Sequence, residues 1–422
     1  MNSAAVHHAT IQRAALVVPI CSPPIEDGAV LLDGGVIRSL GKFHDVKRRA
    51  PLAASVVDHG PSSVILPRFV NCHCHLELSW AMGRIPEGLG FGKWLKRLMS
   101  LIHTEGVSQS DHERLGHIAR GLELACGCGT GLVGDISNTP YDTQKIPSIS
   151  SSLISNKPFI HNFLEIIHPE TDVLALDPQI LDAGDDRQFL LRRSFSAHSV
   201  YTCSRQALGA IKEDCSRRGY PFSIHVSESQ EELEFVRSAK GPISAILESR
   251  GRDISRFFRC STSPMSLLSE EGLLDDKTLC VHCVFVDDSD IDKVVETGAW
   301  VCLCPESNLF ISGRLPPVDT FIKRGVKLCI GTDSLASGTN LSILSQLRTI
   351  FEAFPSVEPW RLVEAATLGG ASALGLGERF GCIAPGRVGA LLVLSDVDAR
   401  AGEIYEFLCT EPVEERMKPV DT

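Results

Sequence analysis

The sequence lacks a net positive charge, long hydrophobic runs and low-complexity segments. Its 422 residues carry a formal net charge of −11 at pH 7, and such an acidic chain is poorly suited to neutralise a phosphate backbone or dock on an anionic membrane. The one apolar run near the start, Ala14–Cys21, is too short to span a bilayer and has neither the basic region nor the cleavage site of a signal peptide. We therefore expect a globular protein with neither nucleic acid nor membrane as its partner.

The cysteine content does not indicate a disulfide framework. There are fifteen Cys, an odd number without a secretory signal, and several lie in apolar strand-like runs. We interpret them as reduced core thiols and predict a cytoplasmic location. The pairs Cys126/Cys128 and Cys302/Cys304 have no second pair at zinc-finger spacing, so packing is their expected role as well.

The pattern along the chain predicts two domains. Residues 1–63 contain short apolar runs broken by Pro and Gly, and residues 381–422 return to the same pattern, so both ends are predicted to form one small, discontinuous β-sandwich domain. Residues 64–380 alternate short apolar strands with amphipathic segments, as repeated β/α units do. We predict an α/β fold, with a (β/α)8 TIM-type barrel beside the small domain.

The barrel segment contains eight predicted strands, and nearly all of them end in residues that can bind metal or move protons. The strands are 64–75, 131–137, 158–166, 193–199, 221–227, 278–286, 300–308 and 327–334. The residues at their ends are His73 and His75, Asp135, Glu165, His198, His225, His282, Asn308 and Asp333. Because the C-terminal ends of barrel strands meet at one mouth, we expect these residues to form one site.

Two histidines close the first of these strands. Side chains alternate along a strand, so His73 and His75 face the same side and Cys74 faces the other. Two imidazoles on one face can hold a single zinc or iron ion. Taken alone, the pair is equally compatible with two buried structural histidines.

Three later strands carry further candidates. His225 is followed three residues later by Glu228, which places a metal ligand next to a proton carrier. Asp333 can bind metal and accept a proton from water, or it can cap the next helix. His282 lies in a run too apolar to leave it without a partner, so it either orients a water or is a satisfied core histidine.

In their order along the chain, these residues resemble the amidohydrolase superfamily, in its one-metal cytosine deaminase and chlorohydrolase branch. The resemblance covers nearly the whole chain, including residues 66–71, 307–308 and 381–390. It implies one divalent ion per chain, with zinc expected first and iron as the alternative. The metal ligands that it implies are His73, His75, His225 and Asp333.

The same resemblance implies roles for the neighbouring residues. Glu228 is similar to the proton shuttle of the family, and His282, together with Asp333, is expected to position the attacking water. His198 and Asn308 are expected to contact the substrate. Two-metal members carry a carboxylated Lys at the end of the fourth strand, where this chain has Ala197 and His198, so one metal is expected.

The implied activity is hydrolytic deamination. A metal-bound hydroxide would attack the amine-bearing carbon of a small aminated heteroaromatic ring, in a purine nucleoside-like substrate. Residues 75–79 and 91–95 resemble aminodeoxyfutalosine deaminases in particular. Glu306 replaces an Arg common in the family and is expected to alter substrate polarity. A homodimer is also implied by the family.

Two other functions stay open at this point. The chain could be a chlorohydrolase, or another hydrolase of this family that displaces a different leaving group. In a different class, it could be a non-catalytic binding protein on the same barrel. Five other histidines are interpreted as solvated or packing residues, namely His7, His8, His103, His112 and His117.

Overall fold

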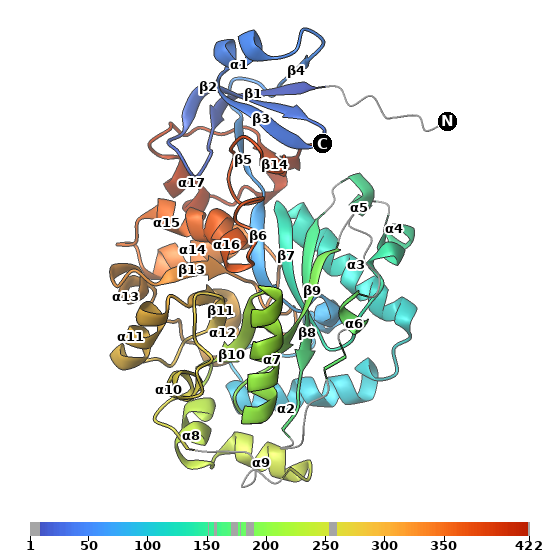
Figure 1. Cartoon of the computed structure of the whole chain (residues 1–422), viewed down its shortest axis with the longest axis vertical. Helices are drawn as coiled ribbons and strands as arrows, with labels where there is room; N and C mark the ends of the chain where they lie inside the picture. The colour runs from blue at the N-terminus through green and yellow to red at the C-terminus, as the bar shows by residue number, and fades with distance from the viewer. Residues whose placement is uncertain are drawn as a thin grey trace.

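The computed structural model describes residues 9–150, 152–155, 158–169, 176–177, 179–182, 190–252 and 260–420. Figure 1 shows a small sheet built from the two ends of the chain, set against one end of a larger body of strands and helices. None of the helices in these ranges is both long enough and apolar enough to cross a membrane. His7 and His8 lie outside the described residues.

The larger body contains two parallel four-stranded sheets that together form a barrel. The first has the order β6 (Phe69–Cys74), β7 (Thr130–Ser137), β8 (Phe159–Ile166), β9 (Leu190–Ala197). The second has the order β10 (Phe222–Val226), β11 (Thr278–His282), β12 (Trp300–Leu303), β13 (Lys327–Ile330). Parallel bridges between Ser199 and His225 and between Cys74 and Asp333 join the sheets at both seams. The predicted (β/α)8 barrel is thereby confirmed.

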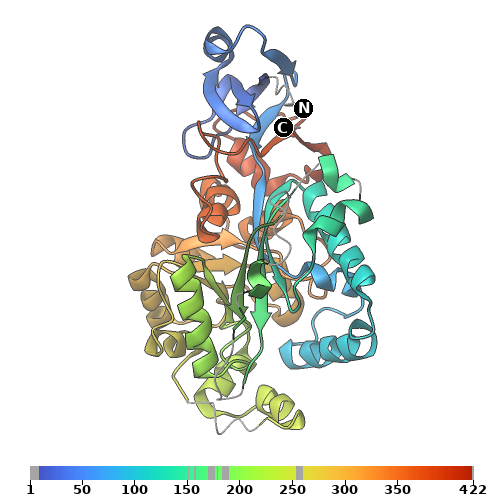
Figure 2. The same cartoon turned by 45° about the vertical axis from the view of Figure 1, so that its right-hand side comes forward.

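Helices lie outside the barrel strands, as the two views in Figures 1 and 2 show. Their ends follow ordinary capping chemistry. For example, Ser110 and Glu113 form a capping box at the start of α3, and α7 begins at a Ser204 cap and ends at Gly219 in the left-handed conformation. Their bounds are α2 (Phe91–Leu101), α3 (Asp111–Gly127), α4 (Ile146–Ile149), α5 (Ser152–Ser155), α6 (Gln179–Asp182), α7 (Arg205–Arg218), α8 (Gln230–Ser238), α9 (Pro242–Ser249), α10 (Pro264–Glu270), α11 (Asp288–Thr297), α12 (Pro305–Ser312), α13 (Val318–Lys323), α14 (Ile343–Ala353), α15 (Pro359–Glu364), α16 (Gly370–Ala373) and α17 (Ile404–Thr410).

The small domain is a mixed sheet to which both chain ends contribute. Its order is β15-β14-β5-β1-β2-β3, with β4 paired to β1. The two ends of the chain meet where β14 runs antiparallel to β5. The bounds are β1 (Thr10–Val17), β2 (Ile25–Asp33), β3 (Val36–Lys42), β4 (Ser55–Asp58), β5 (Val64–Pro67), β14 (Leu391–Leu394) and β15 (Met417–Pro419), with α1 (Phe43–Arg49) after β3.

Several predicted strands differ from the observed ones; for example, β11 ends at His282 and β13 at Ile330, before their predicted limits of 286 and 334. The run 64–75 is divided into β5, which belongs to the small sheet, and β6, which begins the barrel. The run 300–308 stops at Leu303, because Pro305 begins α12 and proline suits the first turn of a helix. The domain limits 1–63, 64–380 and 381–422 stay a prediction.

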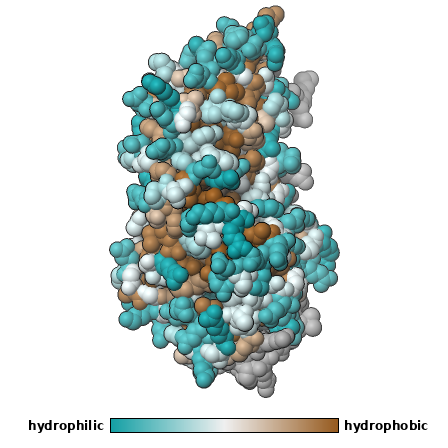
Figure 3. Space-filling view, turned by 90° about the vertical axis from the view of Figure 1, so that its left-hand side faces the viewer, coloured by the Kyte–Doolittle hydropathy of each residue, from teal (hydrophilic) through white to brown (hydrophobic). Residues whose placement is uncertain are grey.

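The surface is mixed on the face seen in Figure 3. Hydrophilic residues cover most of this face, and hydrophobic residues gather along a band through its upper and central parts. The strands of the barrel carry fully buried side chains such as Phe69, Phe163 and Phe222. The barrel is therefore a packed core, and any cavity has to lie at its mouth.

Candidate metal centre

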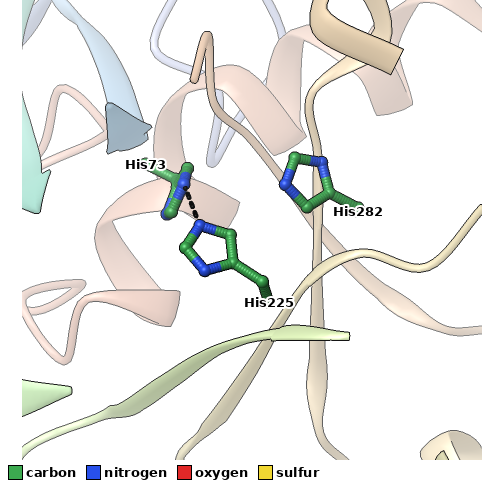
Figure 4. Close-up of side chains that lie close together, drawn as sticks. All are labelled: His73, His225 and His282. Carbon is green, nitrogen blue, oxygen red and sulfur yellow. Dashed lines mark hydrogen bonds between the residues drawn. The ribbon is translucent and has the colours of Figure 1, made fainter. Parts of the chain in front are cut away.

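Four of the predicted metal ligands converge at the mouth of the barrel. His73 Nε2 lies 3.1 Å from His225 Nε2, and Asp333 Oδ1 lies 3.8 Å from His73 Nε2 and 3.5 Å from His75 Nε2. Figure 4 shows the rings of His73 and His225 turned toward each other, with His282 beside them. Ligands of a tetrahedral zinc at ~2.0–2.1 Å lie about 3.3 Å apart. These three spacings, from 3.1 to 3.8 Å, are close to the spacing around one such ion.

Backbone hydrogen bonds at the strand ends hold these residues in place. The carbonyl of His73 accepts from the amides of Thr332 and Asp333, both at 3.0 Å, which joins the ends of β6 and β13. The amide of His225 donates to the carbonyl of His198 at 3.0 Å, which joins β9 to β10. The ligands thus come from strands at both seams of the barrel, and closure of the barrel brings them together.

A second layer of polar groups orients the ligands. His225 Nδ1 lies 2.7 Å from the carbonyl of His198, so this nitrogen donates and Nε2 is left to bind a metal. Asp333 Oδ2 accepts from the hydroxyls of Ser307 and Ser337, at 2.5 and 3.0 Å, while Oδ1 faces the histidines. Such orientation of one nitrogen or oxygen by the other is typical of metal centres.

Burial controls the protonation of the cluster. It lowers the pKa of His73 well below the ordinary value, with further lowering by His225 and His75, and it lowers the pKa of His75 and of His225 as well. Burial would raise the pKa of Asp333, but His75, His282 and the Ser307 hydroxyl outweigh it and lower that pKa. Neutral imidazoles and an ionised carboxylate are the forms that bind metal.

Glu228 and His282 lie together beside the ligand cluster. His282 Nε2 is 3.6 Å from Glu228 Oε1, and the amide of Asn308 contacts His282 Nδ1 at 3.0 Å, which fixes the imidazole ring. Burial, followed by the charges of Asp333 and Glu232, raises the pKa of Glu228 well above its usual range. Burial lowers the pKa of His282 to about 3. The pair thus offers a carboxyl that holds a proton and a neutral imidazole.

The backbone at these strand ends is strained. Ser227, His282, Cys283 and Asp333 have positive φ angles of 55°, 78°, 49° and 59°. Residues other than glycine rarely adopt this backbone conformation, and those that do are often found at functional sites. The amides of Cys283 and Val284 donate to Val226 and Ser227 carbonyls at 3.1 and 2.9 Å, which holds two of the strained turns.

A cavity of about 720 Å³ opens over the cluster. Its floor consists of strand-end residues, namely His75, Asn138, Glu165, His198, His225, Glu228, His282 and Asp333. Its roof consists of α2, the following π-helical segment η2 (Ile102–Gly106) and α9, which supply Phe91, Trp94, Leu95, Leu98, Met99, Ile102, Ile243, Ile246 and Leu247. The amide of Gly92 donates to Glu231 at 3.4 Å and Trp94 Nε1 donates to the Ala336 carbonyl at 3.1 Å, so α2 is tied across the mouth.

Several predicted residues lie away from the cavity. Asn308 is on α12, not on a strand, and its side chain contacts His282 and not the cavity. Asp135 accepts from the Leu76 amide at 3.0 Å and from Tyr141 Oη at 2.6 Å, so it holds the chain after His75. Glu306, expected to alter substrate polarity, is bound instead by Asn340 and Ser345 and is absent from the cavity lining.

Two residues of the cavity were given no role of their own from the sequence. His103, interpreted as solvated or packing, lines the cavity although it lies in the helical segment η2. Glu165 was noted only as a strand end, yet its carboxylate lies 3.7 Å from His225 Nδ1. His198 lines the floor as expected, with Nδ1 2.8 Å from the Thr202 hydroxyl. A contact of His198 with substrate stays a prediction.

Comparison with known proteins identifies the family. Residues 64–413 match the model of the amidohydrolase family. The chain is 32% identical over 381 residues, 87% of its length and 80% of the relative, to 5-methylthioadenosine/S-adenosylhomocysteine deaminase of Syntrophobacter fumaroxidans. It is 26% identical over 365 residues, 82% and 81% of the two lengths, to aminodeoxyfutalosine deaminase of Deinococcus radiodurans.

A solved structure agrees with the fold. An adenosine deaminase from Xanthomonas campestris with bound zinc superposes with a TM-score of 0.77 and 22% identity, covering 97% of this chain and 92% of that chain. The family model spans the barrel strands, all four candidate ligands and β14. The chain therefore belongs to the amidohydrolase family.

Proposed function

We propose that the protein is a metal-dependent hydrolase that deaminates a purine nucleoside-like substrate. The observation that carries this proposal is the convergence of His73, His75, His225 and Asp333 beside Glu228, where all of these residues except His73 line the floor of one cavity. The names of the relatives, which are deaminases of adenosine-type compounds, support the same reaction. In the reaction, the oxygen of water bonds to the ring carbon, the bond from that carbon to the amine breaks, and ammonia leaves.

One divalent ion per chain would be held by His73, His75, His225 and Asp333. When bound, such an ion lowers the pKa of a coordinated water toward neutrality. Zinc is our first choice, because three imidazoles with one carboxylate form a set of ligands that it accepts, and iron is the alternative. The zinc in the similar structure supports this choice.

The remaining residues would move protons and orient the reactants. Glu228, whose carboxyl holds a proton through its raised pKa, would donate that proton to the ring nitrogen next to the reacting carbon. His282, fixed by Asn308, and Asp333 would orient the attacking water. His198 would contact the substrate. Asn308 would then act through His282 and not on the substrate.

The size and lining of the cavity favour a nucleoside with an additional substituent. A volume of about 720 Å³ lies in the range that holds drug-sized ligands, so a bare purine base would leave much of it empty. The roof offers an apolar surface, and Arg250 and Arg252 also line the cavity. We propose a substituent with an apolar stem, as a thioether or aromatic arm provides, and an anionic end accommodated by Arg250.

Ammonia release tests the proposed reaction. Zinc-loaded protein is incubated with 5-methylthioadenosine, S-adenosylhomocysteine, aminodeoxyfutalosine, guanine, cytosine and aminated triazines, and the panel is repeated with His225→Ala. We expect release from an adenosine-type compound by the wild type and none by the variant. Release from none of them, with one metal bound per chain, would contradict deamination.

Two alternatives have separate outcomes in this panel. Chloride release from a chlorinated triazine, without ammonia release, would identify a chlorohydrolase of the same family. Protein that binds a nucleoside but purifies without metal, and stays inactive when zinc is added, would be a non-catalytic binding protein. The set of candidate metal ligands, together with Glu228, favours an enzyme over a non-catalytic binding protein.

A homodimer and a cytoplasmic location are further proposals. All fifteen cysteines are free thiols, which accords with a reducing compartment. Sedimentation equilibrium of the zinc-loaded protein measures the oligomeric state directly, and a monomer at all concentrations would contradict the dimer.

A further inference from the structure

We propose that Glu165 is a specificity-determining residue whose free carboxylate oxygen accepts a hydrogen bond from a pentose hydroxyl of the substrate. This inference rests on the proposed function, since it assumes that a nucleoside occupies the cavity. It concerns a residue of β8 that lies beside the metal ligands without being one of them.

The side chain of Glu165 is buried, and half of its hydrogen-bonding capacity is unused. It is 7% exposed and lines the cavity. Asn138 Nδ2 donates to Oε2 at 2.9 Å, whereas Oε1 has no hydrogen-bond partner among the described residues. Leaving a buried charged oxygen unpaired is costly, so such an atom calls for a partner that arrives with the ligand.

The metal ligands do not supply that partner. His225 Nδ1 lies 3.7 Å from Glu165 Oε1 and already donates to the carbonyl of His198 at 2.7 Å. By comparison, both carboxylate oxygens of Asp135 and of Asp333 face groups of the protein. Asp135 accepts from Leu76, Tyr141 and Asn162, and Asp333 accepts from Ser307 and Ser337 while facing the histidines.

The chemistry of the carboxylate limits what it recognises. An ionised carboxylate only accepts hydrogen bonds, so its partner must be an O–H or N–H group. The ring nitrogens of an adenine that carry lone pairs cannot donate a hydrogen bond to it. The remaining donors are the exocyclic amine and the sugar hydroxyls. The amine reacts where Glu228 and His282 meet, after β10 and β11, whereas Glu165 lies on β8 beside His198.

The position beside His198 strengthens the choice of a hydroxyl. Ligand atoms of Glu165, His198 and His225 lie within 4.8 Å of one another. His198 Nδ1 is occupied by the Thr202 hydroxyl, so its second nitrogen is available on the same floor. A sugar hydroxyl both donates and accepts, and it can bond to the carboxylate and the imidazole together.

The substitution Glu165→Gln tests the inference with little change of shape. In this variant the amide oxygen of the new Gln side chain would still accept from Asn138. Its NH2 group would then face the cavity and present a donor where Glu165 has an acceptor. Steady-state kinetics compare 5-methylthioadenosine with its 2′-deoxy, 3′-deoxy and 2′,3′-dideoxy analogues. Glu306→Gln serves as the matched control, because this carboxylate is near the same mouth but outside the cavity.

We expect Glu165→Gln to lower kcat/KM for the parent nucleoside by about 10- to 100-fold, as loss of a hydrogen bond to a charged group does. For the dideoxy analogue, wild type and variant should agree within about twofold. Glu306→Gln should match the wild type on all four compounds. An equal loss on every compound would overturn the proposal, because it would place the donor on the ring or give Glu165 a structural role. No loss on any compound would overturn it as well.

A binding measurement separates this proposal from the proposed function. Titration calorimetry of the zinc-loaded protein with 5-methylthioinosine and its dideoxy analogue requires no turnover. If the wild type fails to deaminate but its preference for the hydroxylated ligand is lost in Glu165→Gln, the reaction is wrong and the role of Glu165 stands. If the wild type deaminates but shows no such preference, the reaction stands and the role of Glu165 is wrong.

Discussion

The floor and the roof of the cavity are built in different ways. The floor consists of strand ends, held by backbone hydrogen bonds across the barrel and by paired polar groups around each ligand. The roof consists of α2, η2 and α9, which present apolar side chains to the cavity and pack on the body through buried residues such as Trp94 and Ile243. The rigid barrel therefore fixes the reacting groups, while the helices laid over it set the shape of the ligand.

Removing a metal ligand from the floor should have the largest effect. His225→Ala eliminates one imidazole from the donor set and leaves His73 without its neighbour at 3.1 Å. We expect kcat/KM to fall by about 10⁴-fold or more, because water activation and charge stabilisation fail together. Atomic absorption of the purified variant should find less than one zinc per chain. Full zinc occupancy with near-native turnover would exclude His225 as a ligand.

Changing Glu228 should separate proton transfer from metal binding. Glu228→Gln leaves the four candidate ligands in place and removes the carboxyl proton. We expect kcat to fall by about 10²–10⁴-fold, with zinc content unchanged. Stopped-assay ammonia release and metal analysis on the same preparation measure both quantities. Near-native turnover would show that another group carries the proton.

A buried histidine outside the cavity tests how burial alone, without metal binding, changes the pH dependence of stability. His161 on β8 contacts the Ser194 hydroxyl at 2.9 Å, and burial lowers its pKa to about 3. The unfolded chain therefore binds a proton near pH 6.5 that the folded chain refuses, so stability falls as pH falls from about 6.5 toward 3. We expect His161→Phe to reduce this slope by about 1.4 kcal/mol per pH unit. Urea unfolding of metal-free protein between pH 4.5 and 6 measures it, and an unchanged slope would contradict the assignment.

Shortening a roof side chain should affect binding and leave the chemical step intact. Leu95 lines the cavity and is only partly buried, so its truncation should not perturb folding strongly. For substrates with an apolar arm, we expect Leu95→Ala to raise KM by about threefold to tenfold, with kcat within about twofold. A substrate without the arm is the internal control. A fall in kcat of the same size would mean that the roof also positions the reacting groups.

The smallest effect is expected at the exposed edge of the cavity. Arg250→Gln removes a positive charge that is open to solvent, where ion pairs contribute about 0–1 kcal/mol. KM should rise by up to about fivefold for an arm that ends in a carboxylate, and not for a neutral arm. The difference should shrink in 1 M salt. Equal KM changes for both arms would indicate a steric effect.

The floor could be predicted from the sequence more completely than the roof. The spacing of His73 and His75 on a strand, and the strand-end positions of His225, His282 and Asp333, follow from local periodicity, and the barrel converts them into one site. The structure places all five at the mouth.

Other features depend on contacts between distant segments. Asn308 was expected on a strand, but Pro305 starts a helix there. Nothing in the local sequence shows that Asp135 is occupied by Tyr141, that Glu306 turns to Asn340, or that His103 faces the cavity. Each of these outcomes is decided by a partner far along the chain or by the angle of a helix to the barrel.

The left-handed backbone at Ser227, His282, Cys283 and Asp333 has a dynamic consequence. Each such residue stores about 1–3 kcal/mol, which the surrounding contacts must offset. If Asp333 binds the proposed ion, removing that ion with a chelator would take away one of those contacts, and local opening should begin at these strand ends. Amide hydrogen exchange at residues 226–228, 282–284 and 332–334 should then accelerate before that of β1, β2 and β3. The metal would thus also stabilise the conformation of the barrel mouth.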